Sequence, residues 1–312
     1  MSSKLIVILG ATGNQGGSVA EAFLSEPGWK VRALTRNTSS AKAKALSSKG
    51  AEVVQADLDD PSSLNSAFGG AHAIFAVSDF WGLYYNESNR SKTKPGQALN
   101  DWAAQHEEQQ LKNVIDIAAK VPTLERFILS SLSHSEKWSK GKYIRVYHFD
   151  GKARATEYAQ KEHPDLWAKT SVYQAGLFLS NFVLLPPNQP FKDADGVAQF
   201  VSTLEVDTKF PYIAPEEDTG PFVKALIIDE PAGHNLIAYR EWLSANDIAA
   251  AFTKATGIPS KAIKDDGAIP PFGYEGRDDP TVVHPRDLKF APKLSTAEEY
   301  LKKQDWTKVF GS

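Results

Sequence analysis

The sequence predicts a Rossmann-type α/β fold: a doubly wound parallel sheet with helices on both faces, joined to a smaller α+β lobe at the C-terminal end. Two observations carry this prediction. Through the first half of the chain, apolar runs typical of buried strands alternate with segments of helical periodicity. The first apolar run also ends in a glycine cluster, and a helical pattern follows at once. The strand–helix–strand spacing implies right-handed crossovers and therefore parallel strands.

The elements follow from the pattern in chain order. We expect strands over 4–11, 30–36, 51–58, 71–80 and 126–133, and helices over 18–25, 39–50, 61–70 and 98–120. An aromatic loop should occupy 81–95. Later segments predict a strand at 196–204, a strand and a helix within 229–257, a loop or lid over 265–280, and a closing helix that starts with a capping box at Ser295 and Glu298. Residues 1–155 should form the nucleotide-binding lobe, and 156–312 should complete the sheet and build the smaller lobe.

Composition excludes several classes of function. The 312 residues carry a formal net charge of −3, which gives no basic surface for nucleic acid. The absence of cysteine excludes disulfides, thiolate catalysis and cysteine-bound metal. No apolar run approaches the ~20 residues that a membrane helix needs, and we expect no signal peptide, because the residues before the first strand lack its pattern. We therefore expect a cytoplasmic protein, with a nuclear location also open. His106, Glu107 and Glu108 predict no metal site, because adjacent residues do not share a helix face.

The glycine cluster predicts a phosphate-binding turn. Gly10, Gly13 and Gly16 follow a buried strand and lead into a helix, so the backbone can turn sharply and approach a diphosphate without side chains in the way. This G-x-x-G-x-x-G spacing is typical of short-chain dehydrogenases. The alternative is a tight turn without a ligand. The cofactor-binding residues expected in this turn are Gly10, Thr12, Gly13, Asn14, Gln15 and Gly16.

The ends of the next strands predict which dinucleotide binds. The second strand ends at Arg36 with no carboxylate nearby, which favours NADP(H), since a cation can bind the 2′-phosphate. An ordinary surface arginine is the alternative. Strand-end residues would flank the adenine ring (Asp57, Leu58) and approach the second ribose (Val77, Ser78), or would simply cap their strands.

Five blocks together resemble the NmrA-like family, which consists of atypical members of the short-chain dehydrogenase/reductase superfamily. They are GATGNQGGSV, VRALTRN, GAEVVQADLDD, AHAIFAVSDFW and HFDGKARATEYAQ. The set is most similar to the NmrA-like redox sensors, which bind NADPH and act through partner proteins. Other relatives, the isoflavone-reductase-like proteins, are NADPH-dependent reductases. The resemblance therefore implies the cofactor class more firmly than the function.

The chain lacks part of the catalytic motif that is usual in the superfamily, Tyr-x-x-x-Lys. Lys152 is the matching lysine and should contact the cofactor ribose, but His148 stands four residues before it in place of tyrosine. Tyr147 is adjacent, and it could take the acid's place only if the helix starts after Asp150. Ser131, or its neighbour Ser130, ends the fifth strand where a substrate-polarising serine would stand.

Two functions remain open. The first is an NADP(H)-binding sensor that acts through a regulatory protein partner. The second is an NADPH-dependent reductase of a small apolar carbonyl, imine or alkene substrate, with His148, Tyr147 or water as the proton source. An aromatic cluster after the fourth strand, formed by Phe80, Trp81, Leu83, Tyr84 and Tyr85, could wall an apolar substrate pocket or form a partner surface. With Phe178, Asn181 and Phe182 it could line a pocket, and simple core packing is the alternative. A DNA-binding regulator is disfavoured by the charge, and the sequence leaves the oligomeric state open.

Overall fold

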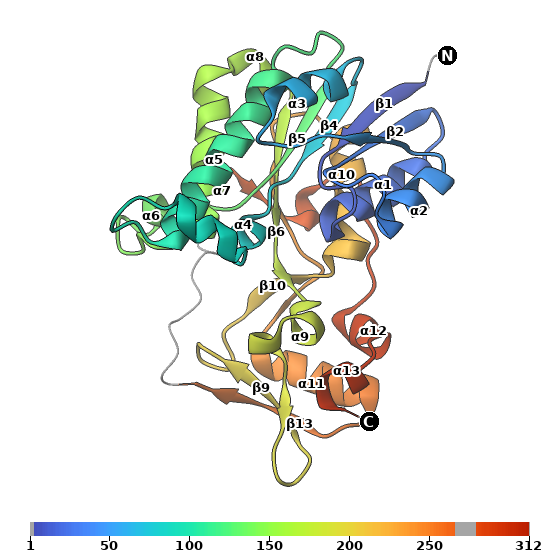
Figure 1. The fold of residues 1–312 in the computed structure, drawn as a ribbon. Coiled ribbons are helices and arrows are strands. Elements are labelled where there is room, and N and C mark those ends of the chain that lie inside the picture. Colours follow the sequence, from blue (N-terminus) through green and yellow to red (C-terminus); the bar gives the residue numbers. More distant parts are fainter. Residues whose placement is uncertain (1–2, 266–278, 312) are drawn as a thin grey trace.

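The central feature of the computed structural model, which describes residues 3–265 and 279–311, is a large parallel sheet (Figure 1). Within these residues the sheet has eight strands in the order β14-β11-β6-β5-β4-β1-β2-β3, and every neighbouring pair is parallel. The strands are β1 (Lys4–Ile8), β2 (Trp29–Thr35), β3 (Glu52–Gln55), β4 (Ala73–Ala76), β5 (Arg126–Ser131), β6 (Thr170–Ala175), β11 (Asn235–Ala238) and β14 (Val282–Val283). The predicted Rossmann-type parallel sheet is confirmed.

Helices cover both faces of this sheet. One face packs against α1 (Asn14–Leu24), α2 (Ala41–Ser48) and α10 (Pro215–Ile228), and the other against α3 (Pro61–Phe68), α5 (Leu99–Ala118), α7 (Tyr147–Glu162) and α8 (Pro164–Trp167). Strand β1 shows why both faces close. Ile6 and Ile8 enter the first core, whereas Val7 enters the second, because successive side chains of a strand point to opposite faces. A continuous apolar run is therefore buried along its whole length, with alternate side chains in the two cores.

The smaller lobe lies below the carboxyl edge of the sheet in Figure 1. In the part of the lobe that the structure describes, the strands form two three-stranded sheets, β12-β10-β7 and β13-β9-β8. They are β7 (Leu177–Phe178), β8 (Phe191–Lys192), β9 (Ala198–Ser202), β10 (Phe210–Ile213), β12 (Glu241–Leu243) and β13 (Ser260–Lys264). Helices α9 (Asn181–Leu184), α11 (Ala245–Thr256), α12 (Ala297–Lys302) and α13 (Thr307–Phe310) complete the lobe. Its core is separate and is built around Phe200, Phe252 and Trp306.

Several boundaries differ from the sequence prediction. Helix α1 begins at Asn14 rather than residue 18, because the extended backbone of Gly13 serves as its N-cap. The region 81–95 is not all loop: it contains most of α4 (Phe80–Tyr84) and the 3-10 helix η1 (Glu87–Lys92). The capping box of α12 is formed by Thr296 and Glu299, one residue later than expected. The predicted loop at 265–280 lies almost entirely outside the described residues.

Short helices connect the larger elements. They are α6 (Ser135–Trp138), η2 (Pro186–Asn188) and η4 (Pro285–Asp287). Helix α6 precedes α7, whose first two turns carry Tyr147, His148 and Lys152, three of the residues expected to be catalytic. Strand order 3-2-1-4-5-6 runs inward from the β3 edge of the sheet, and in this arrangement ligands bind where the order reverses, beside the end of β1.

Candidate functional site

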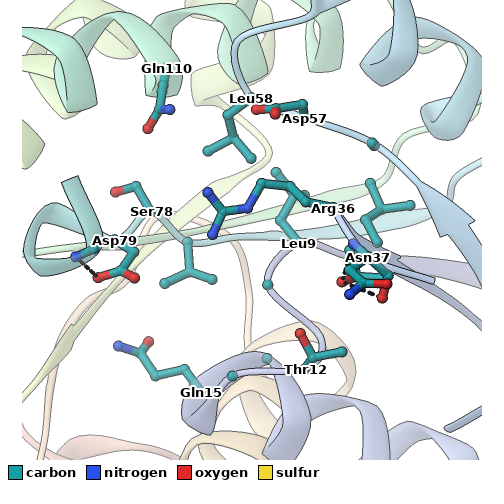
Figure 2. A pocket seen from close by; sticks show the side chains of 18 of the residues that line it. Leu9, Thr12, Gln15, Arg36, Asn37, Asp57, Leu58, Ser78, Asp79 and Gln110 are labelled. Carbon is teal, nitrogen blue, oxygen red and sulfur yellow. Dashed lines mark hydrogen bonds between the residues drawn. The ribbon is translucent and has the colours of Figure 1, made fainter. Parts of the chain in front are cut away.

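A pocket of about 600 Å³ opens at the carboxyl ends of the first four strands (Figure 2). This volume lies within the ~300–1,000 Å³ range of small-molecule and cofactor sites. Every cofactor-binding residue expected from the sequence lines it, except Lys152: these are Gly10, Thr12, Gly13, Asn14, Gln15, Gly16, Arg36, Asp57, Leu58, Val77 and Ser78. The pocket also includes Asp79, Gly82 and Leu83 of the α4 region, Gln110 of α5, and Phe178 of β7.

The glycine turn forms one wall of the pocket with bare backbone. Gly10 has a φ of +61°, a left-handed conformation that favours glycine. A Cβ on Gly16 would lie 2.3 Å from the Gly10 carbonyl oxygen, so the turn and α1 can approach this closely only without a side chain there. Among the described residues, no side chain caps the N-terminus of α1, which leaves backbone N–H groups of its first turn facing the pocket. These donors suit an anionic group.

Arg36 supplies a positive charge to the pocket. Figure 2 shows its side chain extending from the end of β2 into the cavity. Within residues 3–265 and 279–311, its guanidinium makes no side-chain hydrogen bond or ion pair. The neighbouring polar groups are occupied locally, since the Asn37 carbonyl oxygen Oδ1 accepts from the Ser39 N–H and hydroxyl. Arg36 is therefore an available cation where the second strand ends.

A buried carboxylate connects the pocket wall to the expected catalytic lysine. Glu107 of α5 is fully buried, and its Oε1 accepts a hydrogen bond from Ser78 Oγ at 2.8 Å. The same oxygen accepts from Lys152 Nζ, while Oε2 has no hydrogen-bond partner among the described residues. Lys152 is therefore not itself part of the pocket lining but is linked through Glu107 to Ser78, which is.

Helix α7 brings His148 and Lys152 onto one face. The helix begins at Tyr147, so the four-residue offset between them is helical, and Asp150 lies inside the first turn rather than at the N-cap. The His148 ring packs against Phe80 at 5.7 Å and Trp81 at 5.0 Å between centroids. Burial, assisted by the Lys152 charge, lowers the pKa of His148 to about 4. His148 is therefore neutral at neutral pH.

The remaining candidate residues separate in space. Tyr147 packs beside the buried Phe80. Ser130 donates a hydrogen bond to Gln15 Oε1 at 2.8 Å and so reaches the glycine turn, whereas Ser131 Oγ accepts from Thr156 of α7 at 2.7 Å. Adjacent strand residues point to opposite faces of the sheet, which explains the division. Ser130, rather than Ser131, is thus tied to the pocket.

Sequence reasoning missed Glu107, which it considered only as part of a possible metal cluster. The signal was its register in the helix. It lies four residues from both Ala103 and Leu111, two buried positions, so it belongs to the inward face of α5. Two residues expected to line a pocket with the aromatic cluster lie apart: Phe178 lines the pocket, whereas Phe182 packs against Phe200 and Tyr212 in the core of the smaller lobe.

The NmrA-like family model matches residues 2–264. This chain belongs to the NmrA-like family. One relative, the NmrA-like family domain-containing oxidoreductase hkm9 of Aspergillus hancockii, is 30% identical over 270 residues, covering 82% of this chain and 73% of hkm9. The oxidoreductase cpsB of Aspergillus campestris is 27% identical and covers 82% of this chain and 74% of its own length.

Solved structures share the fold. NmrA, a negative transcriptional regulator, in complex with NADP superposes with a TM-score of 0.73 at 19% identity, covering 97% of this chain and 95% of NmrA. The NAD complex of NmrA gives a TM-score of 0.69 at 22% identity, covering 86% and 78%. In the described part of this chain, no helix combines the length and apolar character needed to cross a membrane.

Proposed function

We propose that this NmrA-like protein binds NADP(H) in the pocket and acts as a dinucleotide sensor through a partner protein. The Arg36 side chain, directed into the cavity from the end of β2 and unpaired among the described residues, carries the proposal for the cofactor. A phosphate at the ribose 2′ position would give this guanidinium a charge-assisted hydrogen bond. NmrA, which shares the fold, has been solved with NADP and with NAD, and Arg36 favours the former here.

The residues present suit a dinucleotide. In this proposal the diphosphate binds the turn from Gly10 to Gly16 and the first N–H groups of α1. Asp57 and Leu58 flank the adenine, while Val77 and Ser78 contact the second ribose, with Lys152 behind them. When bound, NADPH supplies a hydride, and a reductase would also need a proton donor on the chain or in water.

The residue in the position of the usual proton donor is poorly suited to donate a proton, and this supports a sensor over an enzyme. A neutral His148 with a pKa of about 4 is a poor proton donor at neutral pH, and tyrosine is missing at that position. The α4 region could transmit the binding of the dinucleotide to a partner protein. Gly82 and Leu83 line the pocket, while Trp81 and Tyr85 of the same segment are stacked and 46% and 61% exposed.

Hydrogen exchange tests the sensor proposal. We expect NADPH and NADP⁺, each at saturation, to protect the glycine turn equally but to protect residues 80–92 to different extents, because differential interaction is what shifts a population. Equal protection of 80–92 by both forms, together with unchanged partner binding, would remove the basis for a sensor.

A reductase of a small apolar substrate is the second candidate. The names of the relatives hkm9 and cpsB, both oxidoreductases, favour it, as does the helical pairing of His148 with Lys152. It requires His148, Tyr147 or water to give the proton. Stopped-flow absorbance should then show NADPH oxidation with a planar apolar substrate, lost in Lys152→Ala at saturating NADPH. Oxidation that persists unchanged in this variant would exclude the proposed role of Lys152.

A further inference from the structure

We propose that Glu107 sets the balance between the oxidised and reduced dinucleotide by cancelling the charge of Lys152 beside the nicotinamide half of the site. This inference rests on the proposed NADP(H) binding and deepens it. Glu107 is then a positioning and charge-compensating residue, because it acts through Ser78 and Lys152 and does not itself line the pocket.

The ion pair between Glu107 and Lys152 lies in the interior of the protein. The Glu107 side chain is 0% exposed and that of Lys152 is 11% exposed. A buried carboxylate is costly unless cations and hydrogen-bond donors compensate it. Here both the ammonium of Lys152 and the hydroxyl of Ser78 donate to the same oxygen, Oε1. The other oxygen, Oε2, is buried without a partner in the described part of the chain. We infer that the desolvation cost of burying Glu107 is tolerated because its negative charge compensates the positive charge of Lys152.

The sheet order identifies the half of the site that this pair serves. Strands β3, β2 and β1 lie on one side of the glycine turn, and β4, β5 and β6 on the other. In a sheet of this order each set of three strands binds one nucleotide half. Arg36, after β2, belongs to the adenosine half. Ser78 follows β4, and Lys152 lies in the crossover helix between β5 and β6, so the ion pair belongs to the nicotinamide half.

Charge at this position discriminates between the two redox forms. The nicotinamide ring of NADP⁺ carries a positive charge, whereas that of NADPH is neutral. An uncompensated ammonium nearby would disfavour the oxidised form, and an uncompensated carboxylate would favour it. At an effective dielectric constant of about 20, a unit charge about 12 Å from another changes an equilibrium about tenfold. Glu107 and Lys152 together remove most of this bias.

The hydrogen bond of Ser78 adds a second consequence. Its hydroxyl proton is committed to Glu107, so the Ser78 oxygen offers only acceptor lone pairs to the pocket. A ribose hydroxyl or carboxamide N–H would fit this acceptor. Glu107 thus fixes both the charge and the hydrogen-bond polarity of that wall.

The test is a double-mutant cycle in which calorimetry measures the dissociation constants. We compare wild type, Glu107→Gln, Lys152→Met and the double variant, using NADP⁺, NADPH and adenosine 2′,5′-bisphosphate, which lacks nicotinamide. The ratio Kd(NADP⁺)/Kd(NADPH) should rise about tenfold in Glu107→Gln, fall about tenfold in Lys152→Met, and return close to the wild-type value in the double variant. The fragment should bind all four proteins alike.

Matched variants keep the outcome interpretable. Glu108→Gln removes a neighbouring carboxylate that pairs with Lys112 and Arg154 instead, and it should leave the ratio unchanged. Should a single variant fail to fold because it leaves one buried charge alone, the other single variant still predicts a shift of defined sign. The conservative Glu107→Asp should keep the ratio close to that of wild type.

The failures of the two proposals are distinguishable. If the fragment binds every variant but the ratio stays constant across the cycle, Glu107 has no role in redox selectivity, while NADP(H) binding stands. If neither the fragment nor the dinucleotides bind wild type, the proposed function itself fails and this inference fails with it.

Discussion

At the scale of single residues, burial governs the chemistry of the candidate site. His148 has the position of the missing tyrosine, yet its aromatic neighbours and Lys152 lower its pKa to about 4. The folded-state pKa lies below the ordinary value of 6.5, so the unfolded chain binds more protons between pH 6.5 and 4. Stability contributed by neutral His148 is therefore present above pH 6.5 and is lost as the pH falls through this window.

This gives a measurable pH dependence. Between pH 7 and pH 5, His148 should lower the free energy of unfolding by about 2 kcal/mol, since one pKa unit corresponds to about 1.4 kcal/mol. Urea denaturation at the two pH values should show a loss that is smaller by this amount in His148→Phe, with His234→Gln as the control for removal of a histidine. An identical loss in wild type and His148→Phe would mean that His148 titrates normally in the folded protein.

The residue scale also shows what sequence could and could not predict. The glycines, Arg36 and the strand-end residues line one pocket, because each follows a strand and parallel strands end at one edge of the sheet; their binding of a cofactor stays a prediction. Glu107 was missed, since a single acidic residue on a helix does not reveal which lysine or serine it will meet. That contact joins residues 45 positions apart and depends on how α5 packs on α7.

At the scale of elements, the contact between the glycine turn and α1 can be tested with two adjacent glycines. Gly16→Ala would bring a Cβ to 2.3 Å from the Gly10 oxygen, whereas Gly17→Ala meets Ala11 at an ordinary 3.4 Å. We expect Gly16→Ala to cost about 1–3 kcal/mol and to abolish dinucleotide binding. Gly17→Ala, inside the helix, should be neutral or slightly stabilising. Thermal melting and calorimetry measure both, and normal NADP⁺ binding by Gly16→Ala would contradict the role given to the turn.

Elements of the first half were easier to predict than those of the second. Strand–helix alternation determines a parallel neighbour order, so the pattern predicts the sheet itself. Strand β8 pairs with β9 in a local hairpin, but β10 pairs with β7 and β13 with β9 across long separations, and periodicity does not specify such partners. The short helix α4 was predicted as loop, because its five residues give too little periodicity to recognise.

At the scale of the whole molecule, a buried ion-pair cluster joins the sheet to the smaller lobe. Arg240, which follows β11, donates to both carboxylate oxygens of Asp218 in α10. It also donates to Ser295 Oγ and the Thr296 carbonyl at the start of α12. The side chains of Arg240 and Asp218 are each 1% exposed, so neither has water as an alternative partner.

Breaking this cluster should destabilise the molecule strongly. Arg240→Met should cost about 3–5 kcal/mol, because it strands a buried carboxylate. Adding Asp218→Asn to this variant should recover part of the loss, since the unpaired charge is removed. Chemical denaturation of the two variants and wild type measures this. A double variant no more stable than Arg240→Met alone would show that the carboxylate is not the source of the cost.

The central claim, that the pocket takes NADP(H) through Arg36, is tested most directly by one calorimetric measurement. It compares Kd(NAD⁺) with Kd(NADP⁺) in wild type and Arg36→Ala, with Lys42→Ala, an exposed lysine outside the pocket lining, as control. A charge-assisted hydrogen bond is worth about 1.5–3 kcal/mol, so wild type and Lys42→Ala should prefer NADP⁺ by about tenfold to a hundredfold. Arg36→Ala should lose that preference through weaker NADP⁺ binding. Equal affinities for NAD⁺ and NADP⁺ in wild type would contradict the claim.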